Sequence, residues 1–187
     1  MCCVRNKENK LDFFKEIFHR DDLNLSGTSI ERLAVRGVII KNNKILLVHL
    51  KNRNEFKFPG GGSNGNESID NILKREILEE TGGIVKEIKR KIGTVVEYNK
   101  KENDHIDFFK MTSEYYEVEI EENLVNQNLD PWEADLEFTP MWISINEAFE
   151  INSKKNSNNE VKDSDWLKRE TFVLGELNMF WSKSKFA

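Results

Sequence analysis

The sequence predicts an α/β protein in which helices flank a mixed β-sheet. Three observations favour this class. Several runs of β-branched and aromatic residues are separated by short polar turns, mostly in hairpin order. One segment near residue 70 has the spacing and the end signals of a helix. The 187 residues, 38% hydrophobic and 33% charged, have the composition of one globular domain with a solvated surface.

The first predicted element is a short amphipathic helix at residues 9–19, because four apolar residues recur there at helical spacing. These residues are Leu11, Phe14, Ile17 and Phe18. A polar stretch from Asp21 to Ser29 reads as a linker. We therefore expect two parts, an N-terminal helix with its linker at 1–29 and the main domain at 30–187.

Two β-rich runs follow, at 33–40 and 44–50. Lys41-Asn42-Asn43 lies between them, and an Asn-Asn turn between such runs predicts a hairpin. A short strand at 56–62 ends in Phe-Pro-Gly-Gly-Gly. A helix is predicted from Ile69 to Thr81, since Ser68 is suited to its N-cap and Gly82 to its end.

The second half of the chain continues in the same manner. Its predicted elements are strands at 84–98 and 106–120 with a polar turn at 99–105, an acidic irregular loop at 121–138, a strand at 141–145, the start of a helix at 146–150, a mobile loop at 152–160 and a helix at 165–183.

The helix at 69–81 carries an acidic cluster. Glu76, Glu79 and Glu80 are spaced i, i+3 and i+4, so their carboxylates share one helix face. Arg75 is the adjacent base, and one guanidinium cannot neutralise three carboxylates. Burying an unpaired carboxylate is costly, whereas clustered hard oxygen ligands suit Mg²⁺ or Mn²⁺. The cluster therefore predicts a divalent-metal site.

Three consecutive glycines, Gly60 to Gly62, precede this helix. Glycine lets the backbone turn sharply and approach a ligand closely. A backbone carbonyl of this turn could supply one more hard oxygen to the metal.

The spacing G-x5-E-x7-R-E-U-x-E-E-x-G, where U is a bulky aliphatic residue, resembles the signature of the Nudix hydrolase family. The matching residues are Gly61, Glu67, Arg75, Glu76, Ile77, Glu79, Glu80 and Gly82. Eight specified positions at fixed spacing make a specific motif. The family usually has an aliphatic residue at the next position, where this sequence has Gly83. The resemblance covers about residues 30–182.

This resemblance implies an α/β/α sandwich around a mixed β-sheet. It also implies an enzyme that uses Mg²⁺ or Mn²⁺ to hydrolyse a nucleoside diphosphate linked to another group. The implied metal ligands are Glu76, Glu79, Glu80 and the carbonyl of Gly61. Glu79 is alternatively the base, Arg75 is expected to orient the carboxylates by pairing with one of them, and Glu67 is expected to bond back to Arg75.

Four further residues are candidates for substrate binding. They are Arg36, Lys57, Tyr98 and Glu133. Arg36 lies in an apolar strand and would bind either a phosphate or a plain ion-pair partner, and Lys57 is a similar candidate. Glu133, Asp135 and Glu137 of the 121–138 loop are each candidates for a further ligand or base, and a solvated loop is the alternative. Tyr98 could stack on a base or pack in the core.

Net charge and cysteine usage limit the possible partners. The formal net charge of −5 and the absence of a basic cluster argue against a stable nucleic-acid complex. Cys2 and Cys3 are the two cysteines, and no apolar stretch approaches membrane-spanning length. We expect a cytoplasmic monomer or homodimer that acts on a small nucleotide-like molecule.

The predicted substrate is a nucleoside polyphosphate or a dinucleoside polyphosphate. Family members acting on ADP-ribose tend to have a proline some fifteen residues after the motif, and 97–100 contains none. Two alternatives remain. One is a Nudix-like module that senses a nucleotide without cleaving it, and intact carboxylates argue against it. The other is an enzyme that processes RNA ends, which should add a basic track.

Overall fold

The computed structural model describes residues 10–100, 105–157 and 166–184. Its strands are β1 (Phe13–Phe18), β2 (Ser29–Val38), β3 (Ile40–Lys41), β4 (Lys44–Leu50), β5 (Glu55–Lys57), β6 (Val85–Asn99), β7 (Phe108–Ile120) and β8 (Phe138–Ile143). Its helices are α1 (Ile69–Thr81), α2 (Pro131–Asp135), α3 (Ile145–Ser157) and α4 (Leu167–Ser184).

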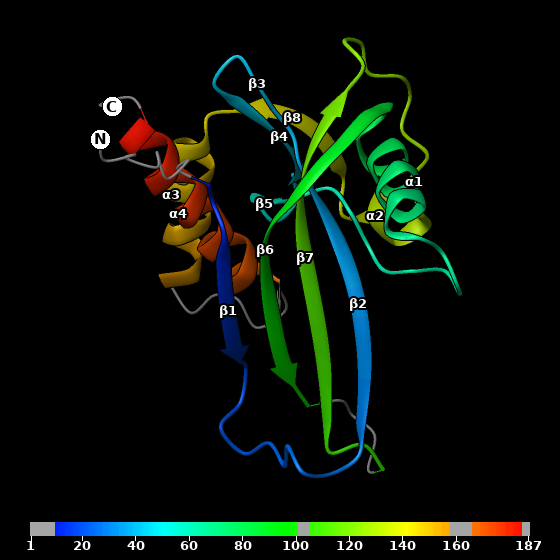
Figure 1. The fold of residues 1–187 in the computed structure, drawn as a ribbon, viewed down its shortest axis with the longest axis vertical. Helices are drawn as coiled ribbons and strands as arrows, with labels where there is room; N and C mark the ends of the chain where they lie inside the picture. The colour runs from blue at the N-terminus through cyan, green and yellow to red at the C-terminus, as the bar shows by residue number, and fades with distance from the viewer. Residues whose placement is uncertain (1–9, 101–104, 158–165, 185–187) are drawn as a thin grey trace, which may run out of the picture.

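The described strands form two sheets. The first has the order β1-β6-β7-β2 and is mixed, because β1 is parallel to β6 and β2 is parallel to β7, whereas β6 and β7 are antiparallel. In the second sheet, β4 pairs antiparallel with β3, β5 and β8. Figure 1 shows α3 and α4 on one side of the molecule and α1 with α2 on the other.

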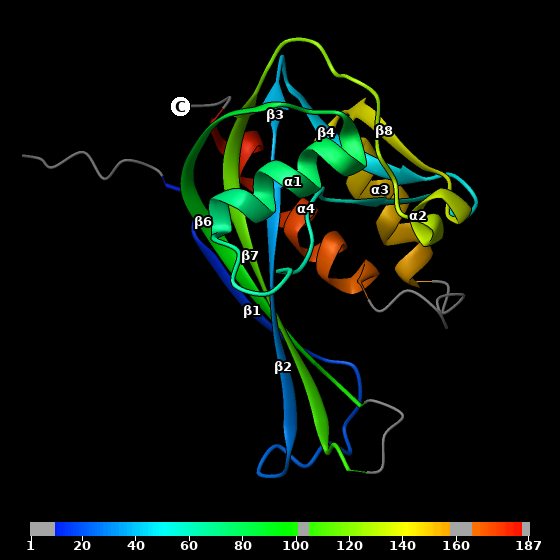
Figure 2. The ribbon, with the colours of Figure 1, turned by 90° about the vertical axis from the view of Figure 1, so that its right-hand side faces the viewer.

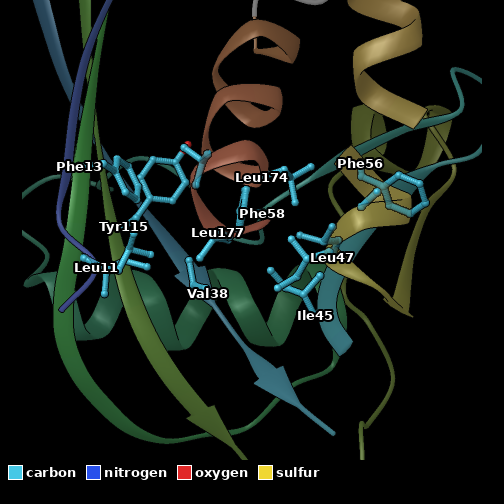
Figure 3. Packing of buried hydrophobic residues seen from close by; sticks show 14 of the residues in the cluster. Leu11, Phe13, Val38, Ile45, Leu47, Phe56, Phe58, Tyr115, Leu174 and Leu177 are labelled. Atoms are coloured by element: carbon cyan, nitrogen blue, oxygen red, sulfur yellow. The ribbon is translucent and has the colours of Figure 1, made fainter. Parts of the chain in front are cut away.

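Successive side chains of a strand point to opposite faces of the sheet, and the Ala34–Val38 part of β2 is buried on both faces in this way. Val38 packs with Val173, Leu174 and Leu177 of α4 in one cluster, which also contains the residues drawn in Figure 3. Val35, of opposite parity, belongs to a second cluster with the apolar side of α1. Helices therefore cover both faces of the mixed sheet along the Ala34–Val38 part of β2, as the sequence predicted, whereas the mostly exposed Ser29–Leu33 part projects beyond α1 and α4 (Figure 2).

The prediction of a helix at 9–19 is wrong, because Phe13–Phe18 is the strand β1. Leu11 and Phe13 are buried, whereas Phe14 is 65% exposed and Phe18 is also exposed. A repeat of two residues thus decides which side chains face the core. The short apolar run is compatible with the spacing of a helix or of a strand. It forms a strand because the edge of β6 supplies backbone hydrogen-bond partners.

The hairpin prediction is confirmed. Lys41 pairs with Lys44 across the turn, and both Asn42 and Asn43 have positive φ, at 51° and 61°. Two central residues with positive φ give the turn whose twist matches paired strands. The run predicted at 33–40 divides between the two sheets.

Two predictions for the later loops need correction. The loop predicted at 152–160 is helical up to Ser157, and its residues 158–160 lie outside the described part. Asn152 is buried there, where its side chain accepts from the Phe56 N–H at 3.0 Å and donates to the Phe56 carbonyl at 2.9 Å. The acidic loop at 121–138 contains the short helix α2.

The remaining predicted helices and strands keep their type; α1 has the predicted bounds, and the others have shifted ends. Cys2 and Cys3 lie outside the described residues. Among the helices that the structure describes, none combines the length and the apolarity that a membrane crossing needs. The division at residue 30 stays a prediction, although β1 belongs to the same sheet as β2.

Candidate active site around helix α1

Helix α1 begins and ends where its sequence signals predicted. The hydroxyl of Ser68 accepts the Asn71 N–H, and Gly82 ends the helix with φ of 72°. The Gly82 N–H donates to the Leu78 carbonyl at 2.9 Å. A left-handed residue after the last turn is the usual glycine ending of a helix. Local chemistry alone therefore fixes the position of the acidic residues along this helix.

The glycine turn before α1 lies against β2. The Val35 N–H donates to the Gly61 carbonyl at 3.0 Å, and the Gly37 N–H donates to the Pro59 carbonyl at 2.8 Å. Gly60 has φ of 138°, and a Cβ on it would lie 2.1 Å from the Val35 carbonyl oxygen. The turn therefore requires glycine at residue 60 and is fixed to the sheet.

Glu80 is the most deeply buried carboxylate of α1, with 1% of its surface exposed. Its Oε1 accepts from the Lys57 ammonium at 2.6 Å, and its Oε2 accepts from the Gly60 N–H at 2.8 Å. Lys57 is 8% exposed and comes from β5. Both oxygens of Glu80 are thus bound by donors that flank the glycine turn.

Arg75 organises the outer part of the cluster. Its Nε and Nη2 bind the two oxygens of Glu67 at 3.0 and 2.9 Å, as the resemblance implied. Its Nη1 reaches Glu76 at 2.6 Å and Glu79 at 3.1 Å. Its Nη2 also donates to the Gly62 carbonyl at 3.1 Å. Hydrogen bonding from Arg75 lowers the pKa of Glu67 to about 2.

The carboxylates of Glu76, Glu80 and Glu133 lie close enough to influence one another. Burial and the charge of Glu80 raise the pKa of Glu76 above its ordinary value. Burial also raises the pKa of Glu133, and the Glu80 charge acts in the same direction. The Lys57 charge acts on both groups in the opposite direction. The carboxylates of Glu67, Glu76, Glu79, Glu80 and Glu133 interact here with two cations, Lys57 and Arg75, so carboxylates outnumber cations in this region.

The three α1 carboxylates do not share one protein partner, and their convergence on a single metal ion stays a prediction. Glu80 turns inward to Lys57, while Glu76 and Glu79 turn to Arg75. Within 10–100, 105–157 and 166–184, no three acidic, histidine or cysteine side chains are grouped as ligands of one ion. Lys57 binds Glu80, and Arg75 binds both Glu76 and Glu79. The helical wheel could not predict this division, because Lys57 comes from another element.

The residues nevertheless fit a hard divalent cation. A Cβ on Gly61 would lie 2.4 Å from the Glu76 carboxylate carbon, so that carboxylate occupies space that only glycine leaves open. Carboxylate and carbonyl oxygens are the donors that Mg²⁺ and Mn²⁺ prefer. The Gly61 carbonyl already accepts one hydrogen bond from β2, and its second lone pair remains for a ligand.

Glu133 reaches this region from α2, and this candidate is buried. Its Oε2 accepts the Asp130 N–H at 2.9 Å and so completes the N-terminal cap of α2. Asp135 and Glu137, the other acidic candidates of this loop, are exposed. Of the three, Glu133 is therefore the carboxylate near Glu80.

The segment before α2 binds the end of α1, which sequence reasoning missed. The Gln127 side chain donates to the carbonyls of Glu80 and Phe138, and the Asn128 N–H donates to the Glu79 carbonyl at 3.0 Å. Carbonyls of a last helical turn have no partner within the helix. An amide residue 47 positions after Glu80 gives no local signal of this contact.

Two of the four predicted substrate-binding residues lie elsewhere or have other partners. Arg36 is buried and donates to the Gly60 carbonyl rather than to a carboxylate, so it supports the turn. Tyr98 is stacked on Phe18 with ring centroids 4.7 Å apart, and its hydroxyl donates to Glu16 at 3.0 Å. The structure therefore places Tyr98 beside β1 and does not bring it to the α1 carboxylates.

A second buried polar cluster lies behind the glycine turn. Arg169 of α4 binds Glu97 and Glu170, and Glu97 is 3.1 Å from His19. Glu170 accepts the Phe58 N–H at 3.0 Å, two residues before Gly60. The side chains of His19, Glu97 and Arg169 also line a cavity of about 160 Å³, together with Asn99, Phe109, Met111 and Trp166.

Comparison with known proteins gives concordant matches. A family model described as NUDIX domain matches residues 31–169. An ADP-ribose pyrophosphatase of Methanocaldococcus jannaschii is 32% identical over 114 residues, which are 56% of this chain and 66% of that protein. The protein named nucleoside diphosphate-linked moiety X motif 6 of Xenopus laevis is 40% identical over 62 residues.

The matched segment of the Xenopus protein is 31% of this chain and 29% of that protein, so the chain spans less than two thirds of both curated relatives. Among solved structures, a NUDIX hydrolase from Nitrosomonas europaea is similar, with a TM-score of 0.50 at 21% identity. The similarity covers 66% of this chain and 79% of that structure. At this identity the likeness concerns the fold.

Proposed function

Because the chain belongs to the NUDIX family, we propose that it is a pyrophosphohydrolase that cleaves the diphosphate linkage of a nucleoside diphosphate derivative. The observation that carries this proposal is the buried acidic region between α1, α2 and the glycine turn. Glu80 accepts hydrogen bonds there from two donors, and it lies close enough to Glu76 and Glu133 to raise the pKa of each.

We propose Mg²⁺ or Mn²⁺ as the cofactor. Glu76, Glu79 and Glu80, with the carbonyl of Gly61, are the residues that would hold it. Bound there, a divalent cation would supply Lewis acidity toward the phosphorus oxygens and the attacking water. Oxygen donors and excess negative charge support this assignment.

The chain's own residues have separable roles in this proposal. Arg75 orients Glu76 and Glu79, because one guanidinium nitrogen reaches both carboxylates. Glu79, which is the more exposed of the two, is a candidate base for a water, and Glu133 is the other. Burial raises the pKa of Glu133, and a carboxylate with a raised pKa accepts a proton more readily. The Gly60 N–H and Lys57 hold the Glu80 carboxylate in place.

The names of relatives support a nucleoside diphosphate linked to another group as the substrate class. Within that class, we retain a nucleoside polyphosphate or a dinucleoside polyphosphate as the substrate. The cavity lined by Phe109, Met111 and Trp166 adds an apolar and aromatic surface that suits a base. Glu170 connects its polar wall to the backbone just before the glycine turn.

The test is a screen of the purified chain for product formation with Mg²⁺. The panel should contain ADP-ribose, nucleoside triphosphates and dinucleoside polyphosphates. The matched inactive variant is Glu80→Gln, which is isosteric and removes the charge from a deeply buried ligand. Turnover by the wild type and a loss of about 10²–10⁵-fold in kcat for the variant are expected.

Binding of a nucleotide without turnover of any compound would instead favour the nucleotide-sensing module. Equal turnover by Glu80→Gln would reject the assignment of this carboxylate. The chain's net charge of −5 gives no support to an RNA-end substrate.

A further inference from the structure

Lys57 contacts Glu80, one of the carboxylates that would hold the divalent cation proposed above. Its ammonium lies 2.6 Å from Oε1 of Glu80, and the Gly60 N–H takes the other oxygen at 2.8 Å. A divalent cation needs a carboxylate oxygen at about 2.0–2.6 Å. An ammonium and a divalent cation repel each other strongly at such separations. The two cations therefore compete for one oxygen of Glu80.

Both side chains of the Lys57–Glu80 ion pair are buried. The side chain of Glu80 is 2% exposed and that of Lys57 is 10% exposed. Loss of one partner from a buried ion pair leaves an uncompensated charge and strongly destabilises a fold. Lys57 is thus the side chain that pairs with Glu80 in this buried contact.

Two aromatic rings also lie beside the Lys57 ammonium while it contacts Glu80. The Lys57 ammonium is 4.6 Å from the centroid of the Phe138 ring and 5.9 Å from that of Trp132. Both distances fall within the range at which aromatic faces attract a cation. Trp132 is 51% exposed, so its ring borders solvent. Lys57 can leave Glu80 and still keep favourable contacts.

We propose that Lys57 is a resident counter-ion, a positioning residue that holds Glu80 until a divalent cation is bound and then moves from Glu80 toward the rings of Phe138 and Trp132. The proposal rests on the metal dependence proposed above and deepens it. Its consequence is a site that stays folded without metal but holds free metal ions weakly, because each binding event has to break the Lys57–Glu80 contact.

Calorimetric titration with Mn²⁺ alone tests this exchange on the full chain. Lys57→Met and Lys57→Gln should each bind Mn²⁺ at least about tenfold more tightly than the wild type, because a competing charge is gone. Lys57→Arg, which keeps the charge, should resemble the wild type. The matched control is Lys155→Met, which removes a lysine 3.3 Å from another buried carboxylate, Glu55, and should leave Mn²⁺ affinity unchanged.

Thermal melting supplies the second measurement. Without metal, Lys57→Met should melt below the wild type, and Mn²⁺ should raise its melting temperature more than it raises that of the wild type. If Lys57→Met does not fold without metal, Lys57→Gln decides, since its amide can still donate to Glu80.

Unchanged or weaker Mn²⁺ affinity in the neutral variants would overturn the proposal, and so would the absence of Mn²⁺ binding in all variants. These readouts involve no substrate. Failure of the hydrolase assignment would therefore appear separately, as a lack of turnover in a protein whose Mn²⁺ affinity still depends on Lys57.

Discussion

Gly61→Ala tests how the glycine turn positions a carboxylate of α1. The added Cβ would lie 2.4 Å from Cδ and Oε1 of Glu76 and 2.5 Å from its Oε2, whereas ordinary contact begins at 3.4 Å. The Glu76 carboxylate has to move by about 1 Å, which breaks its 2.6 Å contact with Arg75.

The backbone should tolerate this change. Gly61 is not among the glycines with positive φ, and the group it would displace is the end of a flexible side chain. We expect a loss of stability of about 1 kcal/mol. A misplacement of 1 Å in a catalytic group lowers a rate by about 10²-fold. The expected result is therefore a large fall in kcat with a folded protein.

Gly62→Ala is the matched control, because a Cβ there would meet only the Leu33 carbonyl oxygen at 3.7 Å. The assay is kcat and KM at saturating Mg²⁺ for the wild type and both variants, with a melting curve for each. Wild-type kcat in Gly61→Ala would refute the reasoning. Equal losses in both variants would also refute it, since the clash with Glu76 would then not be the cause.

Three further predictions follow from the same structure. Hydrolysis should stop in excess chelator and return with Mg²⁺ or Mn²⁺, and undiminished turnover in chelator would exclude a metal cofactor. Gly82→Ala should lower stability by about 1–3 kcal/mol in urea unfolding, because φ is 72° and its Cβ would lie 1.9 Å from the Val125 carbonyl oxygen. Gly65 has the same φ, but a Cβ there would meet no atom within 4 Å, so Gly65→Ala measures the backbone strain alone. Similar losses of stability in the two variants would exclude the clash with Val125 as the cause. Burial alone would raise the pKa of Glu97, but Arg169 and a hydrogen bond from His19 hold it below the ordinary value of 4.5. The stabilisation by ionised Glu97 is present above pH 4.5 and is lost as the pH falls from 4.5 through the lower pKa of the folded protein. The difference in melting temperature between the wild type and Glu97→Gln should therefore shrink below pH 4.5. A difference that stays constant with pH would contradict this prediction.

The helix of the candidate site could be predicted from sequence because its signals are local. Ser68, Gly82 and the spacing of three glutamates lie within fifteen residues, and α1 has the predicted bounds. The contact of Glu67 with Arg75 was also predicted, since the motif contains both partners. Local chemistry of this kind does not depend on how distant segments pack.

The partners that surround α1 could not be predicted, since they come from distant segments. Lys57 pairs with Glu80 across 23 positions and Arg169 pairs with Glu97 across 72. Such pairs are chosen by sheet topology and helix docking. The strand at β1 was missed for the same reason, because the free edge of β6 decided its conformation.

The position of β1 and α4 bears on how the molecule could be shortened. The span matched by the family model, 31–169, excludes β1 and all but the first turn of α4. A protein trimmed to that span would expose the long edge of β6 and remove apolar side chains of α4 from the core. Unprotected strand edges invite pairing between molecules. The smallest piece of this chain that keeps its solubility in isolation should therefore begin before Leu11 and extend through Leu177.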